Sequence, residues 1–141
     1  MSVNTDITIS EYDRLANLET AVFGGPNPGD AGPKIAPVFY TGAADHIAYP
    51  GIAVLSRAGV DAALLAAPVS GIDDGKQLLI VSMSAYVHTV TTPANTIVAG
   101  TGSTYDRITF SAHVGANILL EAQQGIWVVV KQTGITSLTE V

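Results

Sequence analysis

Apolar and polar residues alternate along much of the chain after residue 50. The clearest run is 107–114, in which Ile108, Phe110, Ala112 and Val114 share one face. A second run is 81–89, in which one face carries Val81, Met83, Ala85, Val87 and Thr89. Alternation with a period of two is typical of β-strands that bury one face.

Five further strand candidates are rich in β-branched residues and separated by clusters of turn-forming residues. They span 51–56, 62–67, 118–122, 126–131 and 135–139, with turns at 70–75, 93–95, 100–103, 115–117, 123–125 and 133–134. No helical period separates them, so βαβ units are not expected. The seven candidates over residues 47–141 predict an all-β fold: an antiparallel β-sandwich or jelly-roll-like domain.

The strand candidate at 126–130 differs from the others because it lacks polar alternation. It reads Ile-Trp-Val-Val-Val, so we expect it to be covered on both faces, by another subunit or by the chain's own N-terminal part. Ile126, Val128 and Val130 are therefore candidates for a subunit interface.

Residues 1–46 are expected to form an N-terminal arm with one short helix at about 10–22. Ser10 can cap the helix, with Asp13 three residues later, and the helical spacing aligns Tyr12, Leu15, Leu18 and Val22 in one apolar stripe. An isolated helix of this length is marginal in water, so the stripe must dock, either on the β domain or on another subunit.

The segment 24–37 is predicted to be extended, because eight of its fourteen residues are glycine or proline. Ordering it costs about 1 to 2 kcal/mol per residue, and its own side chains bury little apolar area. We therefore expect a partner to hold the arm. The expected anchors of this contact are Tyr12, Leu15, Leu18, Val22, Phe23, Ile35, Phe39 and Tyr40.

The composition of the chain excludes several classes of binding partner. The net charge is -6 with six cations along the chain, so neither nucleic acid nor an anionic membrane surface is expected to bind. No apolar run is long enough for a transmembrane helix, and the start lacks the features of a signal peptide. Only 13% of residues are charged whereas 48% are hydrophobic, which indicates surface hidden by partners.

No pattern of residues indicates catalysis. His88 and His113 share strand parity with polar neighbours, so both are predicted to face outward, and a third metal ligand is missing. Asp73-Asp74-Gly75-Lys76 is predicted to be a tight turn rather than a cation loop. Nucleophile motifs and phosphate-binding glycine loops are absent from the sequence. We expect no enzyme activity, no catalytic residue, no cofactor and no metal.

The chain nevertheless resembles a known family over about 52–130. The resemblance is carried by Asp74-Gly75-Lys76, Leu79-Ile80-Val81-Ser82, His88-Thr89-Val90-Thr91-Thr92, Thr109-Phe110, Gly115, Ile118, Leu120, Ala122, Gly125 and Trp127. This run is similar to the head decoration (cement) proteins of tailed bacteriophages. The resemblance implies a homotrimer, made in the host cytoplasm, that sits on the outside of the virion head and clamps neighbouring major capsid subunits.

Two other classes remain open. A trimeric receptor-binding or fibre-tip module of a phage tail would bind a glycan or a host protein through exposed aromatic residues, of which Tyr86 and Tyr105 are available. A cupin-type barrel would need His and Glu clustered inside it. The outward parity predicted for His88 and His113 argues against the barrel.

Overall fold

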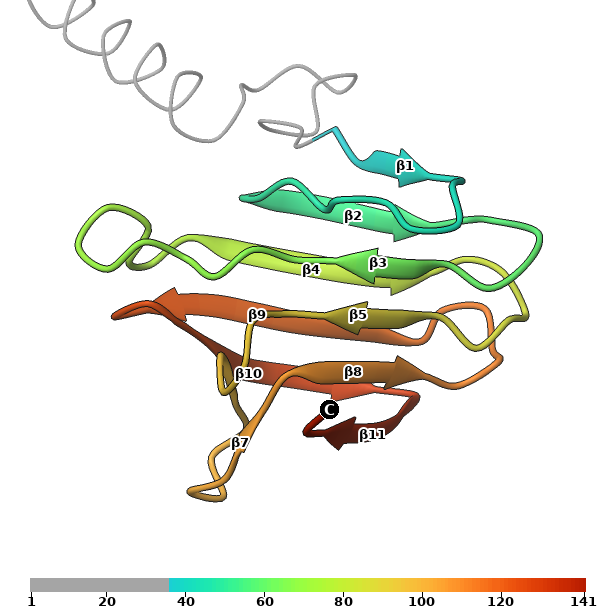
Figure 1. The fold of residues 1–141 in the computed structure, drawn as a ribbon. Coiled ribbons are helices and arrows are strands. Elements are labelled where there is room, and N and C mark those ends of the chain that lie inside the picture. Colours follow the sequence, from blue (N-terminus) through green and yellow to red (C-terminus); the bar gives the residue numbers. More distant parts are fainter. Residues whose placement is uncertain (1–35) are drawn as a thin grey trace, which may run out of the picture. The chain divides into compact units, whose positions relative to one another are not determined.

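Eleven strands and no helix make up residues 36–141, the part of the chain that the computed structural model describes (Figure 1). They are β1 (Val38–Tyr40), β2 (Gly51–Leu55), β3 (Ala62–Leu64), β4 (Gln77–Ser82), β5 (Thr89–Thr91), β6 (Ile97–Val98), β7 (Thr104–Tyr105), β8 (Arg107–Phe110), β9 (Asn117–Gln123), β10 (Ile126–Thr133) and β11 (Ile135–Thr139). The predicted all-β class is confirmed for this part. The predicted helix at 10–22 lies outside the described residues, as does the extended segment up to residue 35.

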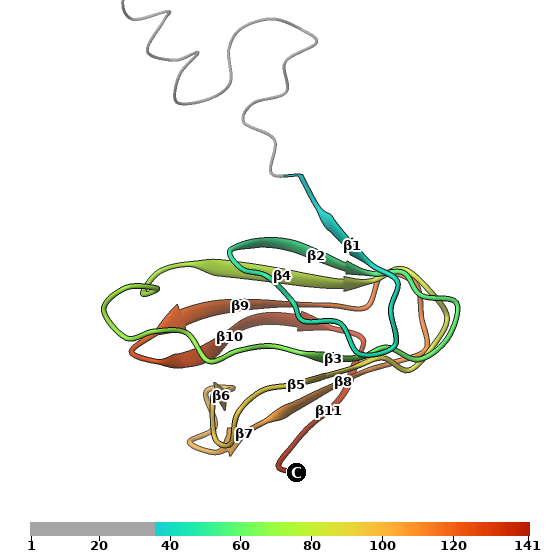
Figure 2. The ribbon, with the colours of Figure 1, turned by 45° about the horizontal axis from the view of Figure 1, so that its top comes forward.

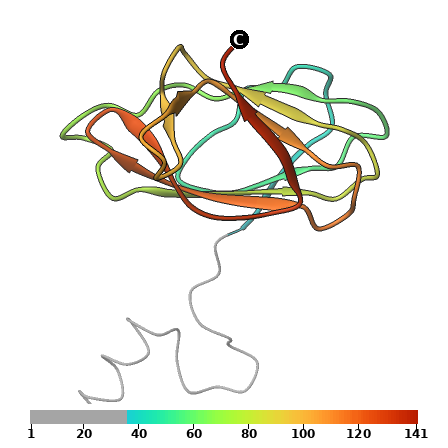
Figure 3. The ribbon, with the colours of Figure 1, turned by 90° about the horizontal axis from the view of Figure 1, so that it is seen from below.

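The strands form two sheets, which Figures 2 and 3 show as two layers. The seven-stranded sheet has the order β1-β2-β4-β9-β10-β6-β7, and the four-stranded sheet has the order β11-β8-β5-β3. Both are mixed, because β1/β2, β2/β4, β6/β10 and β3/β5 pair in parallel. The expectation of purely antiparallel pairing is therefore wrong.

The parallel pairs have a simple origin in the path of the chain. Strand β3 belongs to the four-stranded sheet, so the chain leaves the seven-stranded sheet after β2 and returns to it as β4, running in the same direction. The connection from β1 to β2 likewise leaves the seven-stranded sheet: it runs beside β3 of the four-stranded sheet, where His46 bridges Leu64 in parallel, and then returns as β2. Alternation in the sequence defines the faces of a strand but not its direction.

The core lies between the two layers. Alternate residues of β4 and β9 point into it, namely Leu78, Ile80, Ile118 and Leu120, and all are fully buried. Trp127 of β10 is also fully buried, and its indole nitrogen donates a hydrogen bond to the carbonyl oxygen of Ala66 over 3.0 Å. Tyr49 packs edge-on against this indole, with ring centroids 4.9 Å apart.

Two of the predicted strands end earlier than expected. Strand β4 stops at Ser82 and β5 begins at Thr89, so the run 81–89 is interrupted by a loop. Strand β8 stops at Phe110, and Val114 is exposed rather than sharing the buried face of Phe110. The alternation continues beyond both strand ends, but its apolar residues there point to solvent.

Strand β10 is covered on one side only by the described residues. Trp127 faces the core, whereas Ile126 and Val128 lie half-buried on the other side. A β-bulge between Val129 and Lys131 leaves Val130 51% exposed. Within residues 36–141, the expected covering of both faces is therefore not observed.

Candidate interaction surface

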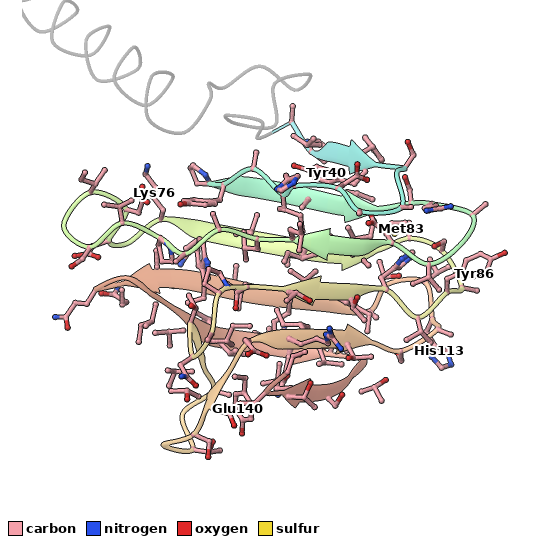
Figure 4. All side chains as sticks on the ribbon, viewed as in Figure 1. Tyr40, Lys76, Met83, Tyr86, His113 and Glu140 are labelled. Atoms are coloured by element: carbon pink, nitrogen blue, oxygen red, sulfur yellow. The ribbon has the colours of Figure 1, made fainter. Side chains whose placement is uncertain are left out.

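Three loops meet at one end of the body, which we call the loop end. They are the β2–β3 loop (56–61), the β4–β5 loop (83–88) and the β8–β9 loop (111–116). Figure 4 shows Met83, Tyr86 and His113, from two of these loops, at this end. The strands β2, β4 and β8 all run toward it, which explains why their following loops converge (Figure 1).

Backbone hydrogen bonds tie the three loops together. The N–H of Gly115 donates to the carbonyl of Ser82 over 2.7 Å, and the N–H of Thr89 donates to the carbonyl of Asp61 over 3.0 Å. The N–H of Met83 donates to the carbonyl of Leu55 over 2.9 Å. The loop end is thus anchored at the base of each loop by neighbouring strands.

The tips of the loops expose large apolar side chains. Their exposed fractions are Val60 52%, Met83 50%, Tyr86 43%, Val87 45% and Val114 60%. The loops 83–88 and 111–116 contain no Asp, Glu, Lys or Arg. Aromatic and Met side chains with few charges are typical of the centre of a protein–protein interface. The loop end therefore has the composition of a contact surface.

A buried polar cluster supports these tips. His88 is fully buried, so the prediction that it faces outward is wrong. Its Nδ1 accepts a hydrogen bond from the backbone N–H of Asp61 over 3.1 Å, and its Nε2 lies 2.7 Å from Oγ of Ser84. Burial lowers the pKa of His88, and the ring is neutral because protonation would leave a buried charge without a partner.

The bond from Asp61 also determines which nitrogen of His88 carries the proton. Because Nδ1 is the acceptor, the proton is on Nε2, and Nε2–H donates to the Ser84 hydroxyl. A catalytic histidine would instead accept the proton of the serine at this nitrogen. The pair therefore has the geometry of a structural link and not that of a nucleophile with its base.

Asp61 is the second buried group of the cluster. Its Oδ1 accepts the N–H of Asp45 over 3.4 Å, whereas its Oδ2 is buried without a hydrogen-bond partner among the described residues. Burial raises the pKa of Asp61, and the neighbouring Asp45 carboxylate adds to the shift by repulsion. The hydrogen bond from the Asp45 N–H opposes the rise in pKa, and Arg57 of the same loop opposes it more weakly. A proton on the Asp61 carboxyl would relieve both the burial and the repulsion.

The predicted site residues are only partly brought together. Tyr12, Leu15, Leu18, Val22, Phe23 and Ile35 lie outside the described residues. Phe39 and Tyr40 belong to β1, where Phe39 is 64% exposed and Tyr40 packs in the core. Ile126 and Val128 lie on the same side of the seven-stranded sheet as Phe39, away from the core. Whether these residues contact a partner remains a prediction.

The predicted tight turn at Asp73-Asp74-Gly75-Lys76 is confirmed. Asp73 accepts hydrogen bonds from the N–H of Val69 and from Nζ of Lys76, both over 2.7 Å. The Lys76 bond is the largest cause of the lowered pKa of Asp73. Gly75 adopts a φ of 86°, which a residue with a Cβ reaches only with strain.

Two open hollows lie on the described surface. One, of about 590 Å³, is lined by residues 102–105 and 138–140, including Tyr105 and Glu140. Another, of about 340 Å³, lies beside His46 and Leu64. Among residues 36–141, no three His, Cys, Asp or Glu side chains gather as metal ligands, and no helix could cross a membrane.

A scan of protein-family models and a search of curated proteins both found no match to this sequence.

The alternation in the sequence did not predict the loop end, because it placed Met83, Val87 and Val114 on strand faces. A usable signal was the absence of charged residues from Gln77 to Tyr105, a span of 29 residues that includes the whole β4–β5 loop.

Proposed function

We propose that this chain is a structural virion protein that binds the outer surface of a phage capsid and clamps neighbouring major capsid subunits. The resemblance of residues 52–130 to head decoration proteins supports this role. We place a capsid contact at the loop end, and we retain the jelly-roll-like description of the two mixed sheets as part of the proposal.

The observation that carries the proposal is the set of exposed apolar tips at the loop end, two of whose three loops, 83–88 and 111–116, contain no Asp, Glu, Lys or Arg. Full burial of one large apolar side chain contributes about 1.5 to 3 kcal/mol, so five side chains that are half exposed could contribute about 4 to 7 kcal/mol. The loss of translational and rotational freedom on association costs at least about 4 kcal/mol of free energy. One loop end alone would therefore bind weakly, and further contacts are needed.

Two sources of further contact fit a clamp. The arm would add its anchors Tyr12, Leu15, Leu18, Val22, Phe23 and Ile35 as further contacts with the capsid. Copies joined in a homo-oligomer would bind with a much smaller loss of entropy for each capsid contact after the first. A clamp needs affinity without turnover, which agrees with the expectation that no catalytic group or cofactor is involved.

Binding to empty phage shells that lack a decoration protein tests the proposal. The full chain is mixed with shells and pelleted, and Val87→Asp is compared with Val69→Asp. Val87 is 45% exposed at the loop end, and Val69 is 51% exposed in the β3–β4 loop at the opposite end. The two variants make the same change of charge and size at similar exposure.

The expected result is that the wild type and Val69→Asp pellet with shells and raise their melting temperature, whereas Val87→Asp stays in the supernatant. Equal binding by both variants would remove the loop end from the contact. No pelleting of the wild type with any shell would contradict the decoration role.

A receptor-binding or fibre-tip module is the second candidate, and the exposure of Tyr86 favours it. The Tyr86 side chain is 43% exposed at the loop end, where a host glycan or protein could stack on the ring. Tyr105, the other aromatic residue considered, is half-buried beside an open hollow. Binding of the chain to host cells or a glycan array, lost in Tyr86→Ala and without binding to shells, would favour this function.

A further inference from the structure

The outer face of the seven-stranded sheet, which points away from the four-stranded sheet, is apolar. Ile52 of β2, Leu79 of β4 and Leu119 of β9 form one row across it. Val54, which is buried at 7% exposure, and Val81, which has intermediate exposure, form the next row. A sheet face that meets water normally carries polar residues at such positions.

This face is uncovered in the part of the chain that the structure describes. Leu78, Ile80, Ile118 and Leu120 on the inner side are fully buried. Their outward neighbours Leu79, Val81 and Leu119 keep intermediate exposure, as do Ile126 and Val128 at the far side of the face. These side chains shield one another but have no opposing layer within residues 36–141.

The charges on the face are balanced. The register places Glu121 opposite Val128 and Lys131 opposite Leu119, which puts one acid and one base on the outer side. Neither is in an ion pair within residues 36–141, where Lys76 and Asp73 form the ion pair. Its other polar side chains are uncharged, such as Gln77 and Asn117.

This balance indicates a second copy as the occupant. The chain carries a net charge of -6, so most contacts between two copies would bring acidic groups together. The outer face avoids this repulsion because each copy presents one charge of each sign. Two copies that meet face to face can place Glu121 of one opposite Lys131 of the other, around a shared apolar centre.

We propose that the outer face of the seven-stranded sheet is the contact between copies of this chain, with Glu121 and Lys131 as its reciprocal charged pair. The proposal is independent of capsid binding, which we place at the loop end. It also gives a physical role to Ile126 and Val128, which lie at the border of the same face.

The size of the face determines how the contact must be measured. Five strands about 4.8 Å apart and about six residues long give a footprint of roughly 480 Å². Stable interfaces bury about 800 Å² per partner. We therefore expect a reversible association that depends on concentration, measurable by sedimentation velocity over about 1 to 100 μM.

The decisive experiment reverses the charges one at a time and then together. Glu121→Lys and Lys131→Glu, each alone, put two like charges on every copy, and we expect each to raise the dissociation constant at least about tenfold. The double variant Glu121→Lys/Lys131→Glu restores one charge of each sign, so association should return. Glu140→Lys makes the same change at an exposed position off this face and should leave association unchanged.

Several results would overturn the proposal. They are a monomeric wild type over the whole concentration range, an oligomer that neither single reversal weakens, or a double variant as weak as the single ones. Far-ultraviolet circular dichroism and Trp127 emission confirm that each variant is folded. Failure of shell binding would leave this outcome untouched, since the measurement uses the full chain alone.

Discussion

The backbone N–H of Asp61 donates a hydrogen bond to Nδ1 of His88 over 3.1 Å, although the two residues are 27 positions apart in the chain. This bond joins the β2–β3 loop to the β4–β5 loop beneath the exposed tips of Val60 and Val87. The same imidazole reaches Ser84 on its other side. A single neutral ring thus holds two of the three loops of the loop end.

Replacing His88 by Ala should destabilise the body and loosen the loop end. The substitution leaves a buried N–H of Asp61 without an acceptor, which costs about 1 to 3 kcal/mol, and it also creates a cavity. Urea unfolding followed by Trp127 emission measures the loss, and hydrogen exchange at the Asp61 amide reports the freed donor. His113→Ala, at an exposed position, should stay within about 0.5 kcal/mol of the wild type. Equal effects of the two changes would contradict this role of His88.

Replacing Asp61 by Asn should stabilise the protein near neutral pH. The pKa of Asp61 is raised by burial and by Asp45, so the stability that its protonated form contributes is fully present below the ordinary Asp pKa of about 3.9 and is lost as pH rises through the raised pKa. As pH rises through the raised pKa, the wild type must ionise a buried carboxyl whose Oδ2 has no partner. The amide of Asn is neutral and can donate to Asp45 at every pH.

We expect Asp61→Asn to exceed the wild type by about 1 to 3 kcal/mol at neutral pH, where an unsatisfied buried group costs most. The difference should shrink as pH falls toward about 4, because the wild-type carboxyl then takes up its proton. Unfolding free energies from urea titrations between about pH 4 and pH 8 measure both the difference at neutral pH and its decrease at lower pH. Asp45→Asn, which removes only the repulsion, should give a smaller gain. A difference that does not vary with pH would argue against ionisation of Asp61 as its cause.

Replacing Asp73 by Asn should have the opposite dependence on pH. The bonds from Lys76 and Val69 lower the pKa of Asp73, so its contribution to stability is present above the ordinary Asp pKa and is lost as pH falls through the lowered value. The wild type should therefore melt at a higher temperature than Asp73→Asn at neutral pH. The two melting temperatures should approach each other as pH falls below the ordinary Asp pKa of about 3.9 and through the lowered pKa of Asp73. Lys76→Met, which removes the largest cause of the shift, should give part of the same effect.

The β9–β10 turn offers a test of local backbone strain. Gln124 and Gly125 both adopt positive φ, at 50° and 83°, as a two-residue hairpin turn between these strands requires. Gly125→Ala should cost about 1 kcal/mol, whereas Gln124→Asn should stabilise the body by a few tenths of a kcal/mol. Thermal unfolding of the two variants measures both the expected loss of stability in Gly125→Ala and the expected gain in Gln124→Asn. A neutral Gly125→Ala would show that the turn relaxes without strain.

Local sequence determined the β class and much of the strand map. The bounds of β11 match the prediction, and those of β9 and β10 lie within two residues of it. The turn at 123–125 and the turn ending in Gly75 were also found, because glycine at positive φ leaves a signal in a few adjacent residues. These features depend on neighbours in the chain, and the sequence contains those neighbours directly.

Only the tertiary structure decided the direction of the strands, the burial of His88 and the two exposed apolar surfaces. Period-two alternation places residues on opposite faces but does not tell which face meets another layer. His88 is buried because Asp61 and Ser84 satisfy both its ring nitrogens, and the Asp61 partner is distant in the sequence. Leu79 and Leu119 look like core residues by composition, and they become an outer face because the four-stranded sheet packs on the other side. Hydrophobicity is a property of each residue, whereas burial depends on what the rest of the chain brings against it.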